Sequence, residues 1–340
     1  MNLKYMYSLL AVIVLFLLAY LGVAKAGLEI LFGVIIPYMA VAAFIAGVIY
    51  RVMGWARSPV PFRIPSTCGQ QQSLPWITPN RFDNPFTPKD VVVRMILEVC
   101  CFRSLFRNTR NSIKEGKLVF EWEIWLWLAA LAFHYAFLTV IIRHMRLFTN
   151  PVPFCIKMVE SLDSFFRFEI LTDTVKIGLP GVYLSGLVLL AAVTFLFIRR
   201  MVIPQVKYIS LPADYFPLFL IFGIASTGIL MRYFTKINIV AAKQLTLGLA
   251  SFHPVIPHDM NAIFYVHLFF VCILLAYFPF SKLMHMGGVF LSPTRNLPGN
   301  SRAVRHVNPW NYPVEVHTYE EYEEEFREKM IDAGLPVEKE

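Results

Sequence analysis

The sequence has little charge and no CxxC cysteine motif. Charged residues make up 16% of its 340 residues, whereas a soluble domain usually has about a quarter. Its five cysteines form no CxxC motif, which excludes covalent c-type haem, thioredoxin chemistry and zinc ribbons. Hydrophobic residues, by contrast, make up 57% of the chain. This composition excludes an ordinary soluble enzyme, a disordered chain and a disulfide scaffold, and it predicts a membrane protein.

Long uncharged stretches predict how many times the chain crosses the membrane. A bilayer core about 30 Å thick requires roughly 20 apolar residues in a helix. Six stretches approach this length, and the rest of the chain is too polar to span. They are Met6–Leu21, Leu28–Tyr50, Ile124–Ile142, Gly181–Ile198, Tyr215–Met231 and Ala262–Ser281. The sequence therefore predicts an all-α integral membrane protein with six transmembrane helices.

The first stretch has two interpretations. Lys4 precedes it and Ala24-Lys25-Ala26 resembles a cleavage site, as in a secretory signal peptide. We expect instead an uncleaved anchor that forms a tight hairpin with the second stretch through Gly22–Gly27.

Basic residues are unevenly divided between the two sides of the predicted bundle. The side that holds both termini carries 22 of the 31 Lys and Arg residues. Because cytoplasmic segments accumulate Lys and Arg, we expect both termini in the cytoplasm. Lipid headgroups explain the net charge of +8 better than nucleic acid does, so no nucleic-acid partner is expected. The expected parts are an N-terminal hairpin (1–50), a cytoplasmic basic segment (51–123), a four-helix core (124–285) and an acidic cytoplasmic tail (286–340).

Three polar segments outside the spans have distinct patterns. Val91–Arg110 alternates apolar and basic residues, which predicts either an amphipathic helix at the headgroup surface or an ordinary packed helix. Ser58–Pro88 is rich in proline and should be irregular coil. Tyr319–Met330 is acidic and predicts a helix that is either solvated or docked to a cytoplasmic partner. The basic residues of the first segment are Arg94, Arg103, Arg107 and Arg110.

Four histidines lie within or at the ends of the third and sixth stretches. They are His134, His144, His267 and His285. Ionisable side chains inside a membrane are costly and indicate function by default. A single one is more often a packing residue, but two on each of two helices are harder to explain in that way. Two imidazoles facing each other across an iron bind a b-type haem, so the pattern predicts two haem b groups.

The directions of the two helices predict which histidines face each other. Because the third and sixth stretches are antiparallel, His134 must pair with His285 and His144 with His267. Zinc and di-iron sites need nearby carboxylates or cysteines, and neither histidine-bearing stretch contains Asp or Glu. The alternative function is a cofactor-free transporter whose histidines line a solute path, although no repeat relates the two halves.

Basic residues accompany these histidines. Arg143 precedes His144, Arg232 ends the fifth stretch, and Lys282 lies just before His285. Guanidinium and ammonium groups bind carboxylates, so we expect these side chains to contact haem propionates.

The histidine spacing resembles that of a known family. Ten residues separate His134 from His144 and eighteen separate His267 from His285, which resembles the gamma subunit of respiratory nitrate reductase, a di-haem b quinol oxidase. Further strings that look like this superfamily are Asp214-Tyr215-Phe216, Ser226-Thr227-Gly228 and Pro279-Phe280-Ser281-Lys282-Leu283. Phe102–Thr109 is similar to the DsrM branch, the cytochrome b subunits of Dsr complexes, also called Hdr-like menaquinol oxidoreductases.

The resemblance covers about residues 88–290 and departs from nitrate reductase in the extra N-terminal span and the long basic segment. It implies menaquinol or menaquinone as substrate and a quinol-oxidising role in the cell membrane during sulfate reduction. It also implies a cytoplasmic iron-sulfur partner related to heterodisulfide reductase, together with other membrane and extracytoplasmic electron-transfer subunits. We expect quinone contacts around Arg143, His144, Arg232 and His267.

Overall fold

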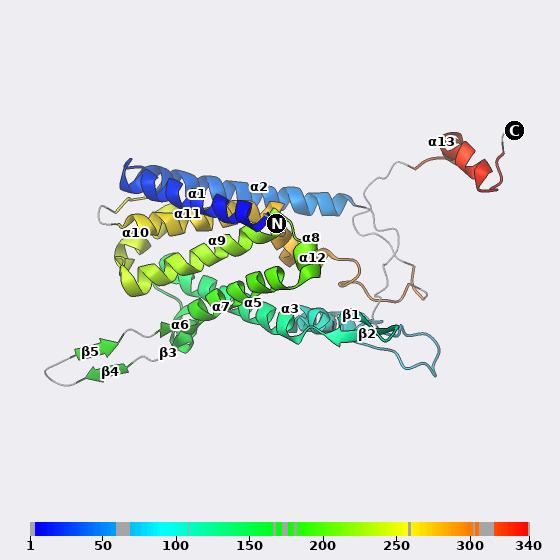
Figure 1. Ribbon diagram of the computed structural model, residues 1–340, viewed down its shortest axis with the longest axis horizontal. Coiled ribbons are helices and arrows are strands. Elements are labelled where there is room, and N and C mark those ends of the chain that lie inside the picture. Colours follow the sequence, from blue (N-terminus) through cyan, green and yellow to red (C-terminus); the bar gives the residue numbers. More distant parts are fainter. Residues whose placement is uncertain are drawn as a thin grey trace. The chain divides into compact units, whose positions relative to one another are not determined.

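The computed structural model describes residues 4–58, 69–107, 109–165, 168–171, 176–179, 182–257, 260–301, 303–305 and 316–338. The chain divides into two compact units. The first unit combines Met1–Arg51 with Val92–Phe290 and contains the membrane helices, and the second combines Val52–Val91 with Leu291–Glu340. Figure 1 labels the elements of both.

The predicted number of membrane-spanning helices is confirmed. Six helices in the described part of the chain are long and apolar enough to cross a membrane. The second begins with a π-helical turn, η1 (Leu31–Ile35), and continues as α2 (Ile36–Arg57). The other five are α1 (Lys4–Ala24), α5 (Ile124–His144), α7 (Leu184–Val202), α9 (Pro212–Ile229) and α11 (Ala262–Tyr277).

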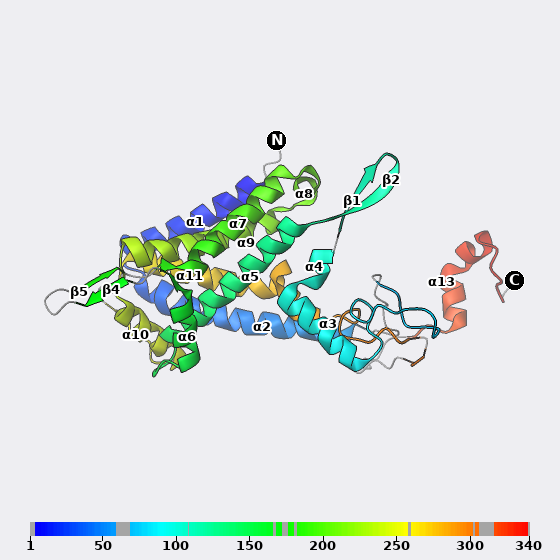
Figure 2. The same ribbon diagram turned by 90° about the horizontal axis from the view of Figure 1, so that it is seen from below.

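The helices of the first unit pack in a defined order. Helix α1 lies against both α9 and α11, and α7 connects α9 to α5 (Figures 1 and 2). Among the described residues, helix α5 is attached to the bundle mainly through α7. Close approach of α9 and α11 depends on Gly223, because a Cβ atom there would lie 2.8 Å from Cε2 of Phe270. Small residues commonly permit such approach in membrane bundles.

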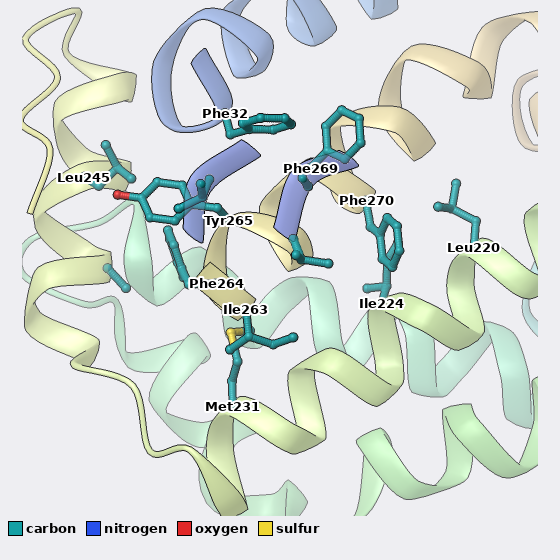
Figure 3. Packing of buried hydrophobic residues seen from close by; sticks show 14 of the residues in the cluster. Phe32, Leu220, Ile224, Met231, Leu245, Ile263, Phe264, Tyr265, Phe269 and Phe270 are labelled. Carbon is teal, nitrogen blue, oxygen red and sulfur yellow. The ribbon is translucent and has the colours of Figure 1, made fainter. Parts of the chain in front are cut away.

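Aromatic side chains fill the core between α9, α11 and the start of the second span. Figure 3 shows Phe32 of η1 close to Phe269 of α11, and their ring centroids lie 5.2 Å apart in an edge-to-face arrangement. Tyr265 is fully buried, with 0% exposure. Because lipid is as apolar as these side chains, close van der Waals packing is what favours their association.

Two features of the C-terminal half were not predicted. The apolar helix α10 (Ile239–Ala250) has 12 residues, too few to span a bilayer. The last span is not continuous up to His285, because α11 ends at Tyr277 and two 3-10 turns follow. These turns are η4 (Phe278–Phe280) and η5 (Lys282–Met284), after which α12 (His285–Leu291) begins. Pro279 cannot donate a helical hydrogen bond, which accounts for the break.

The prediction of one amphipathic helix over 91–110 was wrong beyond Cys101. Helix α3 (Pro88–Cys101) ends there, a short helix α4 (Arg103–Arg107) follows, and the chain then forms a hairpin. Arg94 is buried, with 8% exposure, whereas Val92 and Ile96 of the same helix are exposed. Burial of Arg94 favours a packed helix over one whose arginines all face lipid headgroups. The side chains of Arg107 and Arg110 lie outside the described residues. The hairpin strands are β1 (Thr109–Lys114) and β2 (Lys117–Trp122).

Short elements connect the remaining spans. Their bounds are η2 (Met145–Leu147), α6 (Phe154–Asp163), β3 (Ser164–Phe165), β4 (Phe168–Leu171), β5 (Lys176–Leu179), β6 (Val182–Tyr183), α8 (Pro204–Ile209) and η3 (Leu230–Phe234). Strand β3 pairs with β6, and β4 pairs with β5. These short β ribbons were not predicted, because two to four residues are too few to produce a recognisable alternation.

The second unit contains the predicted tail helix. Helix α13 (Tyr319–Asp332) is capped by Thr318, whose hydroxyl accepts a hydrogen bond from the Glu321 amide. Residues 69–87 contain no helix or strand, as predicted for this part of the proline-rich segment, and residues 59–68 lie outside the described ones.

A candidate cofactor site formed by two histidine pairs

The structure brings the four membrane histidines together in two pairs. His134 on α5 faces His285 at the start of α12, with ring centroids 5.9 Å apart and planes at 83°. His144 at the end of α5 faces His267 on α11, with centroids 6.3 Å apart and planes at 20°. These two combinations, called here the 134/285 pair and the 144/267 pair, are the ones that antiparallel helix directions require.

Hydrogen bonds fix which ring nitrogen carries the proton. In three of the four imidazoles, Nδ1 lies within hydrogen-bond distance of a backbone carbonyl oxygen. A carbonyl oxygen only accepts, so Nδ1–H donates and Nε2 keeps its lone pair for a metal. The contacts are His134 to Ala130 (2.7 Å), His144 to Val140 (2.7 Å) and His285 to Lys282 (2.8 Å).

His267 reaches the same tautomer through a side chain. Its Nδ1 lies 2.9 Å from the Thr227 hydroxyl. That hydroxyl donates to the Gly223 carbonyl at 2.7 Å, so its oxygen accepts from Nδ1–H. The neighbouring Gly228 lies beside the imidazole, and a Cβ there would meet Cε1 of His267 at 3.4 Å, an ordinary van der Waals distance. Thr227 lies in one of the family-like strings, but no role for it was predicted from the sequence.

The ligand set suits axial coordination. Within the described ranges, no group of three or more His, Cys, Asp or Glu side chains is arranged to hold a metal ion. Zinc and di-iron sites require three or more protein ligands. Two facing imidazoles would instead suit a haem, because the macrocycle itself supplies most of the ligands of its iron.

An aromatic ring separates the two arginines that were expected to bind propionates. Cζ of Arg143 lies 3.7 Å from the Tyr183 ring centroid, and Cζ of Arg232 lies 3.9 Å from the same centroid. Such stacking favours a cation over an aromatic face. Arg143 directly precedes His144, and Arg232 follows Gly228 by one helical turn, so this cluster adjoins the 144/267 pair.

Two carboxylates complete the cluster. Nε of Arg143 lies 2.9 Å from Oδ2 of Asp163, and both side chains are buried. The Ser185 amide and hydroxyl donate to the Asp163 carboxylate at 2.7 and 2.6 Å. The second carboxylate belongs to Glu160, which pairs with Arg146 and accepts a hydrogen bond from the Tyr183 hydroxyl.

Burial raises the pKa of Tyr183, and the hydrogen bond to Glu160 raises it further. The phenol therefore stays protonated between the two guanidinium groups. Arg232 has no ion pair with any carboxylate that the structure describes, and its Nε is buried without a hydrogen-bond partner. Arg232 is thus the arginine of this cluster whose charge is still available to an acidic ligand.

Lys282 lies in a different environment from the one expected. Its Nζ is 2.7 Å from Oδ1 of Asp214 at the start of α9, and the other oxygen of Asp214 accepts from the Leu211 amide. The carbonyl of Lys282 accepts from His285. Lys282 therefore positions a candidate ligand through its backbone, while a protein carboxylate neutralises its side chain.

Taken together, the six apolar helices define an integral membrane protein, and its bundle carries two facing histidine pairs. The chain belongs to the nitrate reductase gamma subunit family, which residues 119–298 match. It is 46% identical over 299 residues to the Hdr-like menaquinol oxidoreductase cytochrome b-like subunit of Archaeoglobus fulgidus, covering 84% of this chain and 85% of the relative. The protein of the same name from Archaeoglobus profundus is 41% identical over 284 residues, covering 81% of each chain. These names support a membrane electron-transfer subunit.

Proposed function

We propose that this chain is the membrane cytochrome b subunit of a menaquinol-oxidising complex and that each histidine pair holds one haem b. When bound, each haem would accept and release one electron between the quinone pool and a partner subunit. The observation that carries the proposal is the arrangement of the pairs: each presents two imidazoles that face each other, with Nδ1 already engaged.

The separations within the pairs fit a metal between two nitrogens. Imidazole nitrogens bind metals at about 2.0–2.1 Å, and each nitrogen lies roughly 1.1 Å from its ring centroid, so two axial imidazoles have centroids about 6.3 Å apart. The observed values are 5.9 Å and 6.3 Å. Hydrogen bonds donated by Nδ1–H also raise the basicity of Nε2 and orient the ring.

Basic side chains near the pairs would bind the acidic groups of the cofactor. Arg232 fits this role best, because its guanidinium is stacked on Tyr183 but has no carboxylate partner among the described residues. Arg143 and Lys282 already pair with Asp163 and Asp214, so a propionate would have to share them. We place the quinone head group near the 144/267 pair, where Arg143 and Arg232 supply hydrogen-bond donors.

The names of the relatives suggest the setting in which the chain works. Both belong to a menaquinol oxidoreductase described as Hdr-like. We therefore propose a cytoplasmic iron-sulfur partner related to heterodisulfide reductase, together with further membrane and extracytoplasmic electron-transfer subunits of a sulfur-metabolism complex. The helices would lie in the cell membrane. Both termini would lie in the cytoplasm, because 22 of the 31 basic residues are on the side of the bundle that holds the termini.

Haem content and the spectra of ligand variants test the proposal. A pyridine haemochrome assay of the purified protein should give two haem b per chain. His134→Ala and His285→Ala should remove one spectral component, whereas His144→Ala and His267→Ala should remove the other. Absence of haem from the wild-type protein would favour a histidine-lined transporter. Losses that follow the combinations 134/267 and 144/285 would contradict the pairing.

A further inference from the structure

Phe102 lies at a strained corner of the chain that precedes residues 119–298, the range that matches the nitrate reductase gamma subunit family. Helix α3 ends at Cys101 and α4 begins at Arg103, and Phe102 between them has a φ of 50°. Bulky residues rarely adopt this left-handed conformation. It persists where the surrounding structure fixes it, and such residues cluster at functional sites.

Helix α5, which carries His134, fixes this corner. The Tyr135 hydroxyl donates to the Cys100 carbonyl at 2.9 Å. The Trp127 indole Nε1 donates to the Cys101 carbonyl at 2.8 Å. Two consecutive carbonyls before Phe102 are therefore tied to α5, one by the direct neighbour of His134.

The corner directs the Phe102 side chain onto a candidate ligand. Its ring lies edge-on to the imidazole of His134, with centroids 4.9 Å apart and planes at 87°. His285 lies 5.9 Å from the same imidazole, and Nδ1 of His134 is held by Ala130. The Phe133 ring also lies edge-on to this imidazole, with centroids 5.1 Å apart. The imidazole thus has four defined neighbours, and Phe102 is the one contributed by the segment before residue 119.

We propose that Phe102 is a positioning residue for the 134/285 pair, covering the His134 imidazole and excluding water from that side of the site. This inference rests on the proposed function, because it assumes that the pair holds a haem. An apolar cover lowers the local dielectric and disfavours the more highly charged, oxidised form of a haem, which raises its reduction potential. The corner between α3 and α4 would then raise the reduction potential of one of the two haems.

Phe106 provides a matched control. It lies in the same corner and has the same side chain, but it packs against Trp127 and Trp122, with centroids 4.9 Å and 5.3 Å away. Deleting either ring removes a similar apolar volume from the corner. Only Phe102→Ala removes a contact with His134.

The test is an equilibrium redox titration of the purified full-length protein, followed at the visible bands of the two haems. The component of the 134/285 pair is identified as the one lost in His285→Ala. In Phe102→Ala, the ratio of reduced to oxidised haem for this component should fall several-fold at a fixed ambient potential, while the other component stays unchanged. Phe102→Leu should restore most of the ratio, and Phe106→Ala should leave both components as in wild type.

Two results would overturn the inference: an unchanged titration in Phe102→Ala, or an equal shift in Phe106→Ala, which would indicate general loosening of the corner. Should Phe102→Ala fail to fold, Phe102→Gly removes the ring and also relieves the positive φ, and the same expectations apply to it. A wild-type protein with no haem would refute the proposed function, whereas two haems with no response to Phe102 would refute this inference alone.

Discussion

Replacing Thr227 by valine should weaken one cofactor site and spare the other. Valine has nearly the same shape but cannot accept the hydrogen bond from Nδ1 of His267, which lies 2.9 Å from the threonine hydroxyl. Thr227 is buried, with 6% exposure, so water does not replace the lost acceptor. An unsatisfied buried donor costs about 1–3 kcal/mol, and loss of such a supporting contact typically weakens metal binding about 10–100-fold. Both estimates give a loss of about 2 kcal/mol in the free energy of cofactor binding at the 144/267 pair, which is roughly 30-fold weaker binding.

Haem retention measures this effect. Purified Thr227→Val protein should lose the spectral component of the 144/267 pair on dilution or dialysis, while the component of the 134/285 pair remains as an internal reference. Thr227→Ser, which keeps the hydroxyl, should behave as wild type. Thr194→Val is the matched control, because Thr194 lies on α7 and donates to the Leu190 carbonyl, and it is absent from the contacts described for the four histidines. Equal retention of both haems in Thr227→Val would show that Nδ1 of His267 needs no acceptor and would refute the reasoning.

Two further predictions concern stability and orientation. Asp163→Asn leaves the buried Arg143 without its counter-charge and should destabilise the protein by about 3 kcal/mol, whereas Glu160→Gln, whose partner Arg146 is partly exposed, should cost less than about 1 kcal/mol. Thermal unfolding compares the two, and equal midpoints would contradict the assignment of Asp163. In a cysteine-free background, Ser73→Cys should be protected from an impermeant thiol reagent in intact cells and Ser251→Cys should react, and the reverse pattern would invert the topology.

The membrane helices and the histidine pairing could be predicted from the sequence because both follow from simple rules. An uncharged stretch long enough to span a bilayer has few alternatives to a transmembrane helix. Once the third and sixth spans are antiparallel, only one pairing of four histidines avoids crossing. Helix α10 escaped prediction because its 12 residues are too few for that rule. The break at Phe102 escaped it because a positive φ at phenylalanine has no signal in the sequence.

The surroundings of the charged residues were not predictable for a different reason. Arg143, Arg232 and Lys282 were recognised as lying near the histidines, but their partners come from distant parts of the chain. Tyr183 reaches Arg143 from 40 residues away, and Asp214 reaches Lys282 from 68 residues away. Only the packing of the bundle brings these groups together. Sequence alone shows which charges lie near a site, and the fold determines which of them are already neutralised.

The way in which α5 is attached to the bundle bears on how the protein is assembled. Each histidine pair joins α5 to the last helical segment, whereas the main packing of α5 in the described bundle is against α7. Folding can thus bring α1, α7, α9 and α11 together before α5 and the last helical segment meet at the histidine pairs. A cofactor bound between α5 and the last helical segment would hold the two together, and its binding free energy would add to the stability of the bundle. The cofactor would then be inserted last, from the side of the bundle. In cells starved of haem, the chain should accumulate in a form in which proteases can cut at the ends of α5.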